Sequence, residues 1–551
     1  MIAPAAAAPY APAAFPVRWE EPTDELLTWT LEPTHWPGPV GRLDGELSMW
    51  LVDAVSAALR RYGEPIALRA RRMNTYVYLA MAPASEPPDP DGAARLRDAI
   101  DRLGELWERE WLPEIQEHLA AWEATEPSAL DGSALAVHLD GTLDRLRRLW
   151  QIHFTAWFPF VGAMSAFVDE HRELLGDGGP LGPYRMLGGL ESKTLETAHA
   201  LWRLGRLAAS DADVRDALAA GDEEGALAAL RSSAAAAPFV AELDAFLARW
   251  GHSGVRDFPS TRSWTEDPTA VVKSLRDALA SDAEDPEPAW SALAADREAA
   301  VAKARAELAV GPPADRDRFE RALASAQVGA VLSEDHSHWI DSLCMYRIRL
   351  VLLEVGRRAV AAGTLAASED VFMLGVDELR TLARVPLAHD RRALVAERRA
   401  EMERFARVAP PPELGAPPAG PPPDTAVGRA LGRFFGGPPP SSQDARLVRG
   451  APASAGRTQG TARVLASFDE AGRVRRGDVL VVRTTTAPWT PLFATVAAVV
   501  TDAGGVLCHA AVVARVYGIP AVVGTGRGTS AIRDGDRVEV DGDAGTVRVL
   551  G

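Results

Sequence analysis

The stretch that decides the fold of the C-terminal region is residues 501–524, TDAGGVLCHAAVVARVYGIPAVVG. It follows an apolar, β-branched run and contains a second one at 520–523, so the pattern predicts two strands joined by one short helix, about His509 to Tyr517. The pair Gly504-Gly505 lets the backbone approach a ligand closely, because glycine carries no Cβ. His509 then falls in the first turn of the helix, where free amides and the positive end of the helix dipole favour an anion.

The sequence around this stretch predicts an α/β domain. Short apolar runs rich in valine are typical of strands, and they recur between turn residues from about 446 to the end of the chain. The expected strands are 461–465, 478–482, 497–500, 520–523, 537–540 and 546–550. The turn DGDAG at 541–545 joins the last two as a hairpin.

Residues 15–406 are predicted to be predominantly helical. Leu96, Ile100, Leu103, Trp107 and Trp111 follow one another at steps of three or four, which is one apolar face of a helix. The same spacing is found at 146–157, 195–207, 214–230, 270–279 and 341–360. Glycine and proline at 176–180 and 311–313 are expected to end helices. The fold class is therefore multidomain, with a large, mainly α-helical domain at 1–408 and the α/β domain at 446–551.

The segment between these domains, 409–445, is rich in proline. Such a composition predicts an extended, semi-stiff connector that cannot pack a core. A disordered loop is the alternative, and composition alone does not separate the two.

Composition excludes several classes of protein. The formal net charge of -17 disfavours a nucleic-acid partner. Two cysteines, Cys344 and Cys508, cannot build a disulfide framework, and Cys508 is expected to be a small buried side chain. The N-terminus does not read as a signal peptide, and no apolar run approaches a membrane span. We expect a cytoplasmic protein.

Several separated blocks of residues 446–551 resemble the swivelling phosphohistidine domain of phosphoenolpyruvate synthase and pyruvate phosphate dikinase. They include GTARV at 460–464, TAPWTPL at 486–492 and the stretch around His509. The resemblance implies a mobile domain in which His509 carries a phosphoryl group. Gly504, Gly505 and Arg515 are the candidates for binding the phosphate, and for Arg515 a structural ion pair is the preferred explanation. Leu507 departs from the threonine usual in that family, so regulation by phosphorylation there is not expected. An inactive relic with a helix-capping histidine is the alternative.

The helical region resembles, more loosely, the substrate-binding domain of rifampicin phosphotransferase. The similar blocks are LGGLESKT at 187–194, WGH at 250–252 with WTEDP at 264–268, and YRIR at 346–349. The resemblance implies that this domain holds a hydroxyl acceptor, which requires cations for the phosphate and a base for the hydroxyl. The candidates are Lys193, His252, Arg256, Arg347 and Arg349, with His336 and His338 as possible bases. For each of them a structural ion pair is the competing explanation.

A metal site is not predicted from this sequence. His336 and His338 are two residues apart and point to different faces of a helix, and the sequence indicates no third ligand. Tryptophans, including Trp150, Trp157, Trp250, Trp264 and Trp339, could line an apolar acceptor pocket or simply pack the core.

The sequence offers no glycine-rich phosphate loop with an adjacent lysine. No ATP-grasp domain is expected ahead of the helical region, and no phosphoenolpyruvate-binding barrel after the swivelling domain. The leading hypothesis is therefore a phosphotransferase whose ATP and Mg²⁺ are bound by a separate ATP-grasp-type subunit. The alternatives are a donor-free enzyme, of dehydratase or cyclase type, that uses the same pocket, and a non-catalytic binding module.

Overall fold

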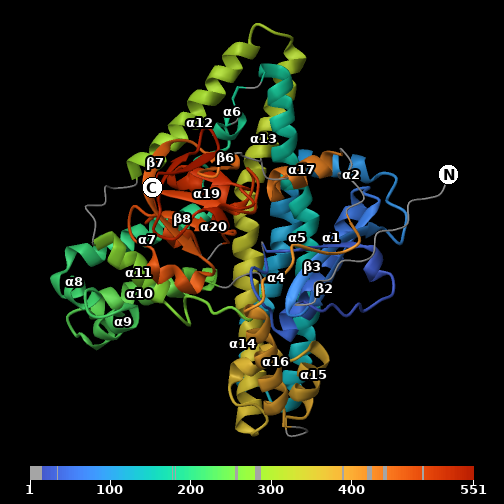
Figure 1. Cartoon of the computed structure of the whole chain (residues 1–551), viewed down its shortest axis with the longest axis vertical. Helices are drawn as coiled ribbons and strands as arrows, with labels where there is room; N and C mark the ends of the chain where they lie inside the picture. The colour runs from blue at the N-terminus through green and yellow to red at the C-terminus, as the bar shows by residue number, and fades with distance from the viewer. Residues whose placement is uncertain are drawn as a thin grey trace.

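The computed structural model describes residues 15–33, 35–176, 178–179, 181–254, 258–279, 287–386, 390–417, 425–437, 444–486 and 489–550. Two long helical elements form its spine (Figure 1). One is α5 (Gly132–Leu175), and the other runs through α13 (Pro313–His336), the π-helical segment η5 (Ser337–Cys344) and α14 (Met345–Ala361). Helix α5 begins at Asp131, whose carboxylate accepts from the Ala134 amide, and ends at Gly176, with φ 79°. The glycine-rich stop predicted at 176–180 is confirmed.

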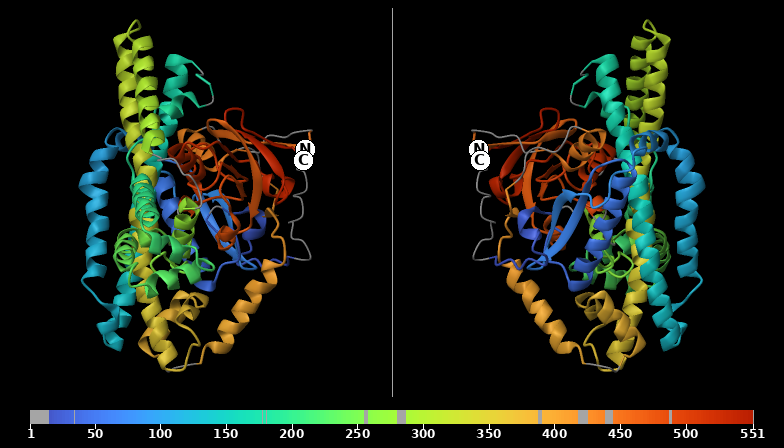
Figure 2. Two further views of the ribbon diagram at one scale, coloured as in Figure 1. Left: turned by 90° about the vertical axis from the view of Figure 1, so that its left-hand side faces the viewer. Right: turned by 90° about the vertical axis from the view of Figure 1, so that its right-hand side faces the viewer.

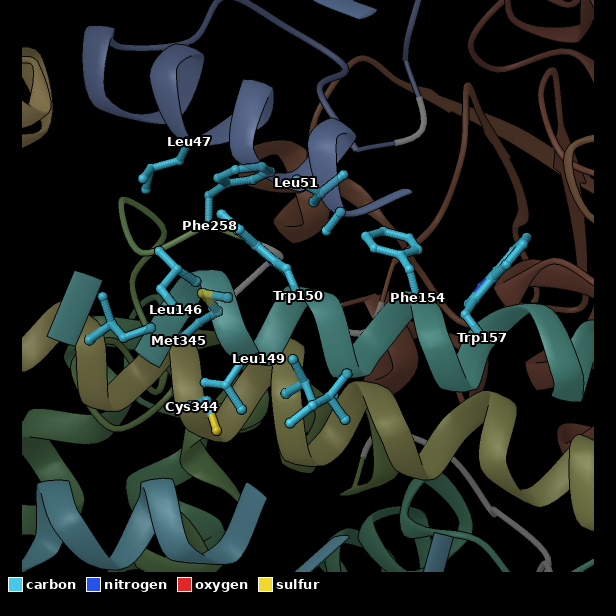
Figure 3. Packing of buried hydrophobic residues seen from close by; sticks show 14 of the residues in the cluster. Leu47, Leu51, Leu146, Leu149, Trp150, Phe154, Trp157, Phe258, Cys344 and Met345 are labelled. Atoms are coloured by element: carbon cyan, nitrogen blue, oxygen red, sulfur yellow. The ribbon is translucent and has the colours of Figure 1, made fainter. Parts of the chain in front are cut away.

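The two halves of the spine share a core with α1 (Arg42–Arg61). Leu146, Leu149 and Trp150 of α5 face Cys344 and Met345 on one side and Leu47 and Leu51 of α1 on the other (Figure 3). These side chains are all buried, and the α5 positions recur at three- and four-residue steps, as the sequence predicts. Burial of this apolar face drives the association of the helices.

Smaller helices surround this spine (Figure 2). On the N-terminal side these are η1 (Asp24–Leu26), α2 (Gly92–Asp101), α3 (Leu103–Leu106), the π segment η2 (Trp107–Trp111), α4 (Leu112–Glu123) and η3 (Pro127–Ala129). In the middle lie α6 (Gly182–Arg185), α7 (Lys193–Ser210), α8 (Ala212–Leu218), α9 (Glu223–Ser232), α10 (Ala237–Trp250), η4 (Gly251–Gly254), α11 (Thr269–Leu279) and α12 (Glu287–Leu308). After the spine come η6 (Ser368–Met373), α15 (Val376–Arg384) and α16 (Arg392–Ala406). The large helical domain is confirmed.

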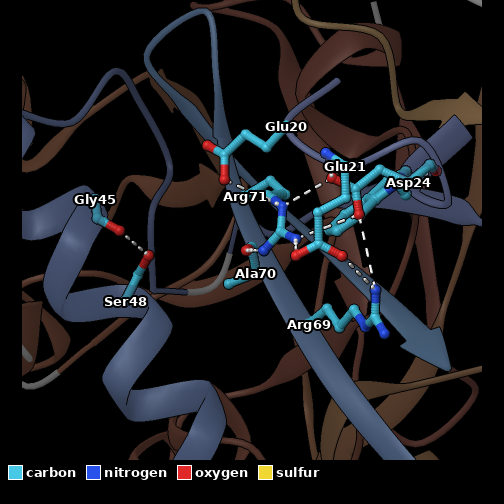
Figure 4. Close-up of polar contacts among 9 residues, drawn as sticks. Glu20, Glu21, Asp24, Gly45, Ser48, Arg69, Ala70 and Arg71 are labelled. Atoms are coloured by element: carbon cyan, nitrogen blue, oxygen red, sulfur yellow. Dashed lines mark hydrogen bonds and ion pairs between the residues drawn. The ribbon is translucent and has the colours of Figure 1, made fainter. Parts of the chain in front are cut away.

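The helical region also contains a small sheet that the sequence did not predict. Its order is β2-β3-β1-β4, all antiparallel, with β1 (Thr28–Leu31), β2 (Ile66–Met73), β3 (Tyr76–Pro83) and β4 (Glu413–Gly415). Strands β2 and β3 join through Asn74 and Thr75, both at positive φ, as a two-residue hairpin turn of the primed type requires. In Figure 4, Arg71 of β2 lies against Glu21 and Asp24, with Nε 3.0 Å from the fully buried Asp24 Oδ2.

The expectation that 409–445 is only an extended connector is wrong. Strand β4 adds to the edge of the small sheet, and α17 (Ala426–Phe435) packs against α5. Arg433 of α17 donates to Asp169 at 2.5 Å and to the Ser165 carbonyl at 2.8 Å. The apolar residues Val427 and Ala430 between the proline runs explain this packing, since both are buried. The runs at 421–423 and 438–440 lie outside the described residues.

The C-terminal domain is an α/β unit, as predicted. Its eight-stranded sheet has the order β5-β12-β11-β7-β8-β9-β10-β6, with β7 to β10 parallel and the other pairs antiparallel. The strands are β5 (Leu447–Arg449), β6 (Ala451–Ser454), β7 (Arg457–Leu465), β8 (Val479–Val482), β9 (Ala498–Thr501), β10 (Ala521–Val523), β11 (Arg537–Asp541) and β12 (Thr546–Val549). The helices are η7 (Phe468–Arg473), α18 (Thr490–Phe493), α19 (His509–Tyr517) and α20 (Gly528–Ala531). This domain lies beside α13 (Figure 1).

Candidate functional site

His509 is the first residue of α19, between the parallel strands β9 and β10, as the sequence predicts. Its side chain is 21% exposed and faces the helical domain. Nδ1 lies 3.7 Å from Oε2 of Glu334, a residue in the last turn of α13. Nε2 is buried and has no hydrogen-bond partner among the described residues. One ring nitrogen thus faces a carboxylate, and the other is unpartnered.

Glu334 is held in place by Thr194, whose hydroxyl donates to Oε2 at 2.7 Å. The Glu334 side chain is 6% exposed. Burial raises the pKa of this carboxyl, but the His509 imidazole and the Thr194 hydroxyl outweigh burial, so the pKa lies below its usual range. Glu334 is therefore a carboxylate that accepts hydrogen bonds and faces the imidazole.

A cavity of about 240 Å³ opens between the two domains at His509. One part of the lining is apolar and comes from α1 and the loop before it, β2, β3, α5 and α17; it includes Trp36, Leu51, Ile66, Leu79, Phe154, Trp157, Leu431, Phe434 and Phe435. Another part is polar and comes from α7, α13, η5 and the C-terminal domain; it includes Lys193, Thr194, Glu334, His336, His338, Asp341, Thr484, Thr485 and His509. Such a lining fits a mostly apolar small molecule with a few polar groups.

Two histidines and a carboxylate gather in the wall of this cavity. His153 of α5 has Nδ1 3.1 Å from Oδ1 of Asp341, and His336 has Nε2 3.9 Å from Oδ2. All three are buried. Burial lowers the pKa of His336 to about 4, and the neighbouring His153 adds to the effect. His336 is therefore a neutral imidazole at neutral pH.

Lys193, His336 and His338 line the cavity, so the structure brings three of the predicted acceptor-site residues together with His509. Lys193 Nζ also pairs with Glu196 at 2.7 Å. His252 lies behind His338, with the ring centroids 4.8 Å apart. Burial lowers the pKa of His252 to about 3 and that of His338 to about 4.

The remaining predicted cations are placed elsewhere. Arg347 pairs with Glu123 at 2.6 Å. Arg349 is fully buried, and it is bound by Glu266 and Glu369. Neither arginine lines the cavity, and both are held in ion pairs of the kind that the structural explanation expects. Arg256 lies outside the described residues.

The phosphate-binding role expected for Gly504, Gly505 and Arg515 is not available in this conformation. The amides of Gly504 and Gly505 donate to the Phe435 and Phe434 carbonyls of α17, at 3.2 and 2.8 Å. Arg515 donates to the carbonyls of Ala453 and Val506, at 2.7 and 2.9 Å, and stacks on Tyr184. The two amides and the guanidinium are thus hydrogen-bonded to backbone carbonyls of other segments. A local sequence pattern does not reveal such tertiary contacts.

Sequence reasoning missed Glu334, His153 and Asp341. His153 lies in an aromatic-rich stretch and Glu334 in an ordinary helical one, so neither carries a local signal. His336 and His338 point to different sides of their helical element, as the sequence predicts. His336 contacts His153, whereas His338 contacts Trp250 and His252. The sequence indicated no further side chain near His336, whereas the structure places His153 and Asp341, from another helix and from the next turn, close to it. Of the tryptophans considered, Trp157 and Trp264 line the cavity.

Comparison with known proteins identifies two regions. Residues 474–545 match the family described as PEP-utilising enzyme, mobile domain. We call the C-terminal domain that contains these residues the mobile domain. Residues 158–334 match the rifampicin phosphotransferase fourth domain, a range that begins within α5 and ends at Glu334. The resemblance found in the sequence is therefore confirmed for both parts of the chain.

Three relatives extend the comparison. The chain is 37% identical to a chondramide synthase of Chondromyces crocatus over 98% of this chain and 14% of the relative. It is 24% identical to an uncharacterized phosphotransferase of Bacillus subtilis over 96% of this chain and 62% of the relative. It is 38% identical to the rifampicin phosphotransferase of Streptomyces sviceus over 36% of this chain and 21% of the relative. The chain thus spans less than two thirds of each of these relatives.

In the part of the chain that the structure describes, none of the helices combines the length and the apolar character that a membrane span requires.

Proposed function

We propose that the chain is a phosphotransferase in which His509 delivers a phosphoryl group to a hydroxyl of a small, apolar or aromatic molecule held in the cavity. One observation carries the proposal: the mobile-domain histidine lines a pocket to which the region matching the rifampicin phosphotransferase fourth domain contributes Lys193, Thr194 and Glu334. Two of the relatives are named as phosphotransferases, which supports the same reaction class.

The unpartnered Nε2 is the nitrogen that we assign to the phosphoryl group. Glu334 lies 3.7 Å from Nδ1 and favours a proton there. In the transfer step the acceptor oxygen bonds to phosphorus and its proton passes to a neutral imidazole, for which His338 is the candidate. The P–Nε2 bond breaks and its electron pair stays on Nε2. His509 is left as a neutral imidazole with the proton on Nδ1.

The donor in this proposal is ATP with Mg²⁺, bound by a separate ATP-grasp-type subunit. The support is chemical: the sequence has no glycine-rich phosphate loop followed by lysine, and the amides of Gly504 and Gly505 are already hydrogen-bonded when His509 lies in the cavity. His509 would therefore receive its phosphoryl group at another place, and reach the acceptor by a domain movement.

A second function, a donor-free reaction such as dehydration or cyclisation, is favoured by the charge of the cavity. Among the lining residues that the structure describes, Lys193 is the only lysine or arginine, and it is already paired with Glu196. Phosphoryl transfer usually takes place among several cations. Neutral histidines beside a carboxylate suit proton transfer without a phosphate equally well.

Intact-protein mass spectrometry under alkaline conditions separates the two functions. The chain is mixed with ATP, Mg²⁺ and a candidate ATP-grasp protein, and the wild type is expected to gain one acid-labile phosphate that maps to His509. The variant His509→Ala is expected to gain none, with unchanged thermal unfolding. An unlabelled wild type, with a partner shown to be active, together with turnover that survives His509→Ala, would establish the donor-free reaction instead.

A further inference from the structure

The cluster of His153, His336 and Asp341 is assembled by three separate features of the helical domain. His153 comes from the middle of α5, His336 ends α13, and Asp341 lies in the π-helical segment η5. Their ligand atoms all lie within 4.8 Å of one another. Because a π turn bonds residues five apart, His336 and Asp341 stack on one face, where a regular α-helix would separate them. Single π turns of this kind are frequent at functional sites.

The groups around the cluster orient each ligand atom. His336 Nδ1 lies 2.7 Å from the Leu332 carbonyl, which fixes the proton on Nδ1 and leaves the lone pair on Nε2, toward Asp341. The Ser337 hydroxyl donates to Asp341 Oδ2 at 2.8 Å. An imidazole that donates its other N–H to a carbonyl, and a carboxylate that is itself hydrogen-bonded, are the usual supports of metal ligands.

The cluster also has an open side. All three residues line the cavity that His509 enters, so a fourth position would face a bound molecule. Three protein ligands with one open position is the arrangement of catalytic zinc sites. The same cavity contains a single lysine and no arginine among the described lining residues, so these residues supply little of the positive charge that a transferred phosphoryl group requires.

We propose that His153, His336 and Asp341 bind one divalent transition-metal ion, with zinc as the preferred class. Two imidazoles and one carboxylate favour such an ion over Mg²⁺, which prefers oxygen ligands. The ion supplies positive charge beside His509 and polarises the acceptor hydroxyl; this role rests on the proposed phosphotransferase function, whereas binding of the ion does not.

The test uses Co²⁺ as a spectroscopic probe on the full chain, with any affinity tag removed and bound metal stripped by a chelator. We expect one Co²⁺ per chain, with visible d–d absorption of a low-coordinate site, and displacement of Co²⁺ by Zn²⁺. The variants His336→Asn and Asp341→Asn each remove a ligand, and each is expected to weaken binding at least about 100-fold. The matched control is His338→Asn, two residues from His336 on the same helical element, and it is expected to bind as the wild type does.

Each other outcome overturns the proposal. Absence of Co²⁺ and Zn²⁺ binding to the folded wild type would leave the cluster as a His–Asp ion pair. Loss of binding in His338→Asn, with binding kept in His336→Asn, would move the metal to the pair formed by His252 and His338. If both ligand variants fail to fold, Ser337→Ala decides, since it is expected to weaken binding about 10-fold to 100-fold and an unchanged affinity would refute the assignment. No nucleotide, donor or acceptor is present, so these results are independent of whether His509 is phosphorylated.

Discussion

Lys273 is the buried cation that joins the helical domain to the mobile domain. It lies on α11, is 5% exposed, and donates from Nζ to the Val474 carbonyl at 2.8 Å and to Asp277 at 2.7 Å. Asp277 also accepts from the Thr495 hydroxyl at 3.2 Å. Two groups of the mobile domain are thus bound by one ion pair of the helical domain, so the docked arrangement depends on this lysine.

The substitution Lys273→Met keeps most of the apolar stem and removes the donor. A hydrogen bond with a charged partner contributes about 1.5–3 kcal/mol. In the undocked state the Val474 carbonyl binds water instead, so the loss acts on the docked state alone. With about 1.4 kcal/mol for each factor of ten, the ratio of undocked to docked protein should rise about 10-fold to 150-fold.

Pulsed electron spin resonance measures this ratio from the distance between two labels. Val310 in the helical domain and Leu550 in the mobile domain are exposed, and both native cysteines are buried, so Val310→Cys and Leu550→Cys direct the labels. Lys303→Met is the matched control, because the Lys303 side chain is 80% exposed and its ammonium pairs with Glu307 of the same helix at 3.8 Å. A distance distribution that is the same in Lys273→Met and in the control would refute the argument that this contact holds the domains together.

Three further predictions follow from other parts of the chain. Gly329→Ala would bring a Cβ within 2.7 Å of a carbonyl oxygen of α5, so the free energy of unfolding measured in urea should fall by about 1–3 kcal/mol. In the control Gly104→Ala the nearest atom to the new Cβ is 3.8 Å away, and the free energy of unfolding should not fall. Burial lowers the pKa of His252 from 6.5 to about 3, so the unfolded chain binds more protons than the folded chain between these pH values. The free energy of unfolding of the wild type should therefore fall as the pH drops through this window. His252→Gln should reduce the slope of this free energy against pH. Glu334→Gln should leave labelling of His509 intact and slow single-turnover transfer about 10-fold to 150-fold, whereas an unchanged rate would exclude Glu334 from the step.

Local patterns in the sequence predicted the elements around His509 well. A histidine between a glycine pair and an apolar helical run specifies α19, whose bounds agree with the prediction, and the DGDAG turn specifies the β11–β12 hairpin. The small sheet was missed because β2, IALRARRM, carries three arginines. These arginines interrupt the alternation of apolar and polar residues by which a strand is recognised. The strand accommodates them because Arg71 and Arg72 pair with carboxylates from other segments.

The cavity could not be predicted, because its residues meet only through tertiary contacts. Glu334 is 175 residues from His509 in the chain, and neither residue signals the other. Asp341 meets His336 only because the helix widens to a π turn, and a search for helical spacing at three and four residues cannot find a pair five apart. The argument that His336 and His338 cannot bind one metal ion together was sound, but it could not show that His153 lies beside His336.

Any movement that takes His509 out of the cavity has to break the contact on one side of α17. Toward α5, this helix buries Val427 and Ala430 in the main core, and Arg433 binds Asp169. Toward the mobile domain, three backbone hydrogen bonds link its last turn to residues 504, 505 and 507, and Leu507 is the mobile domain's one fully buried residue in that core among the described residues. Each backbone bond contributes only about 0.5–1.5 kcal/mol net, and water replaces it on exposure, whereas apolar burial has no such replacement. The weaker side faces the mobile domain, so separation there frees the glycine amides that the sequence assigned to phosphate binding. The same two glycines thus serve as an interdomain contact when His509 faces the acceptor cavity, and as free donors when it does not.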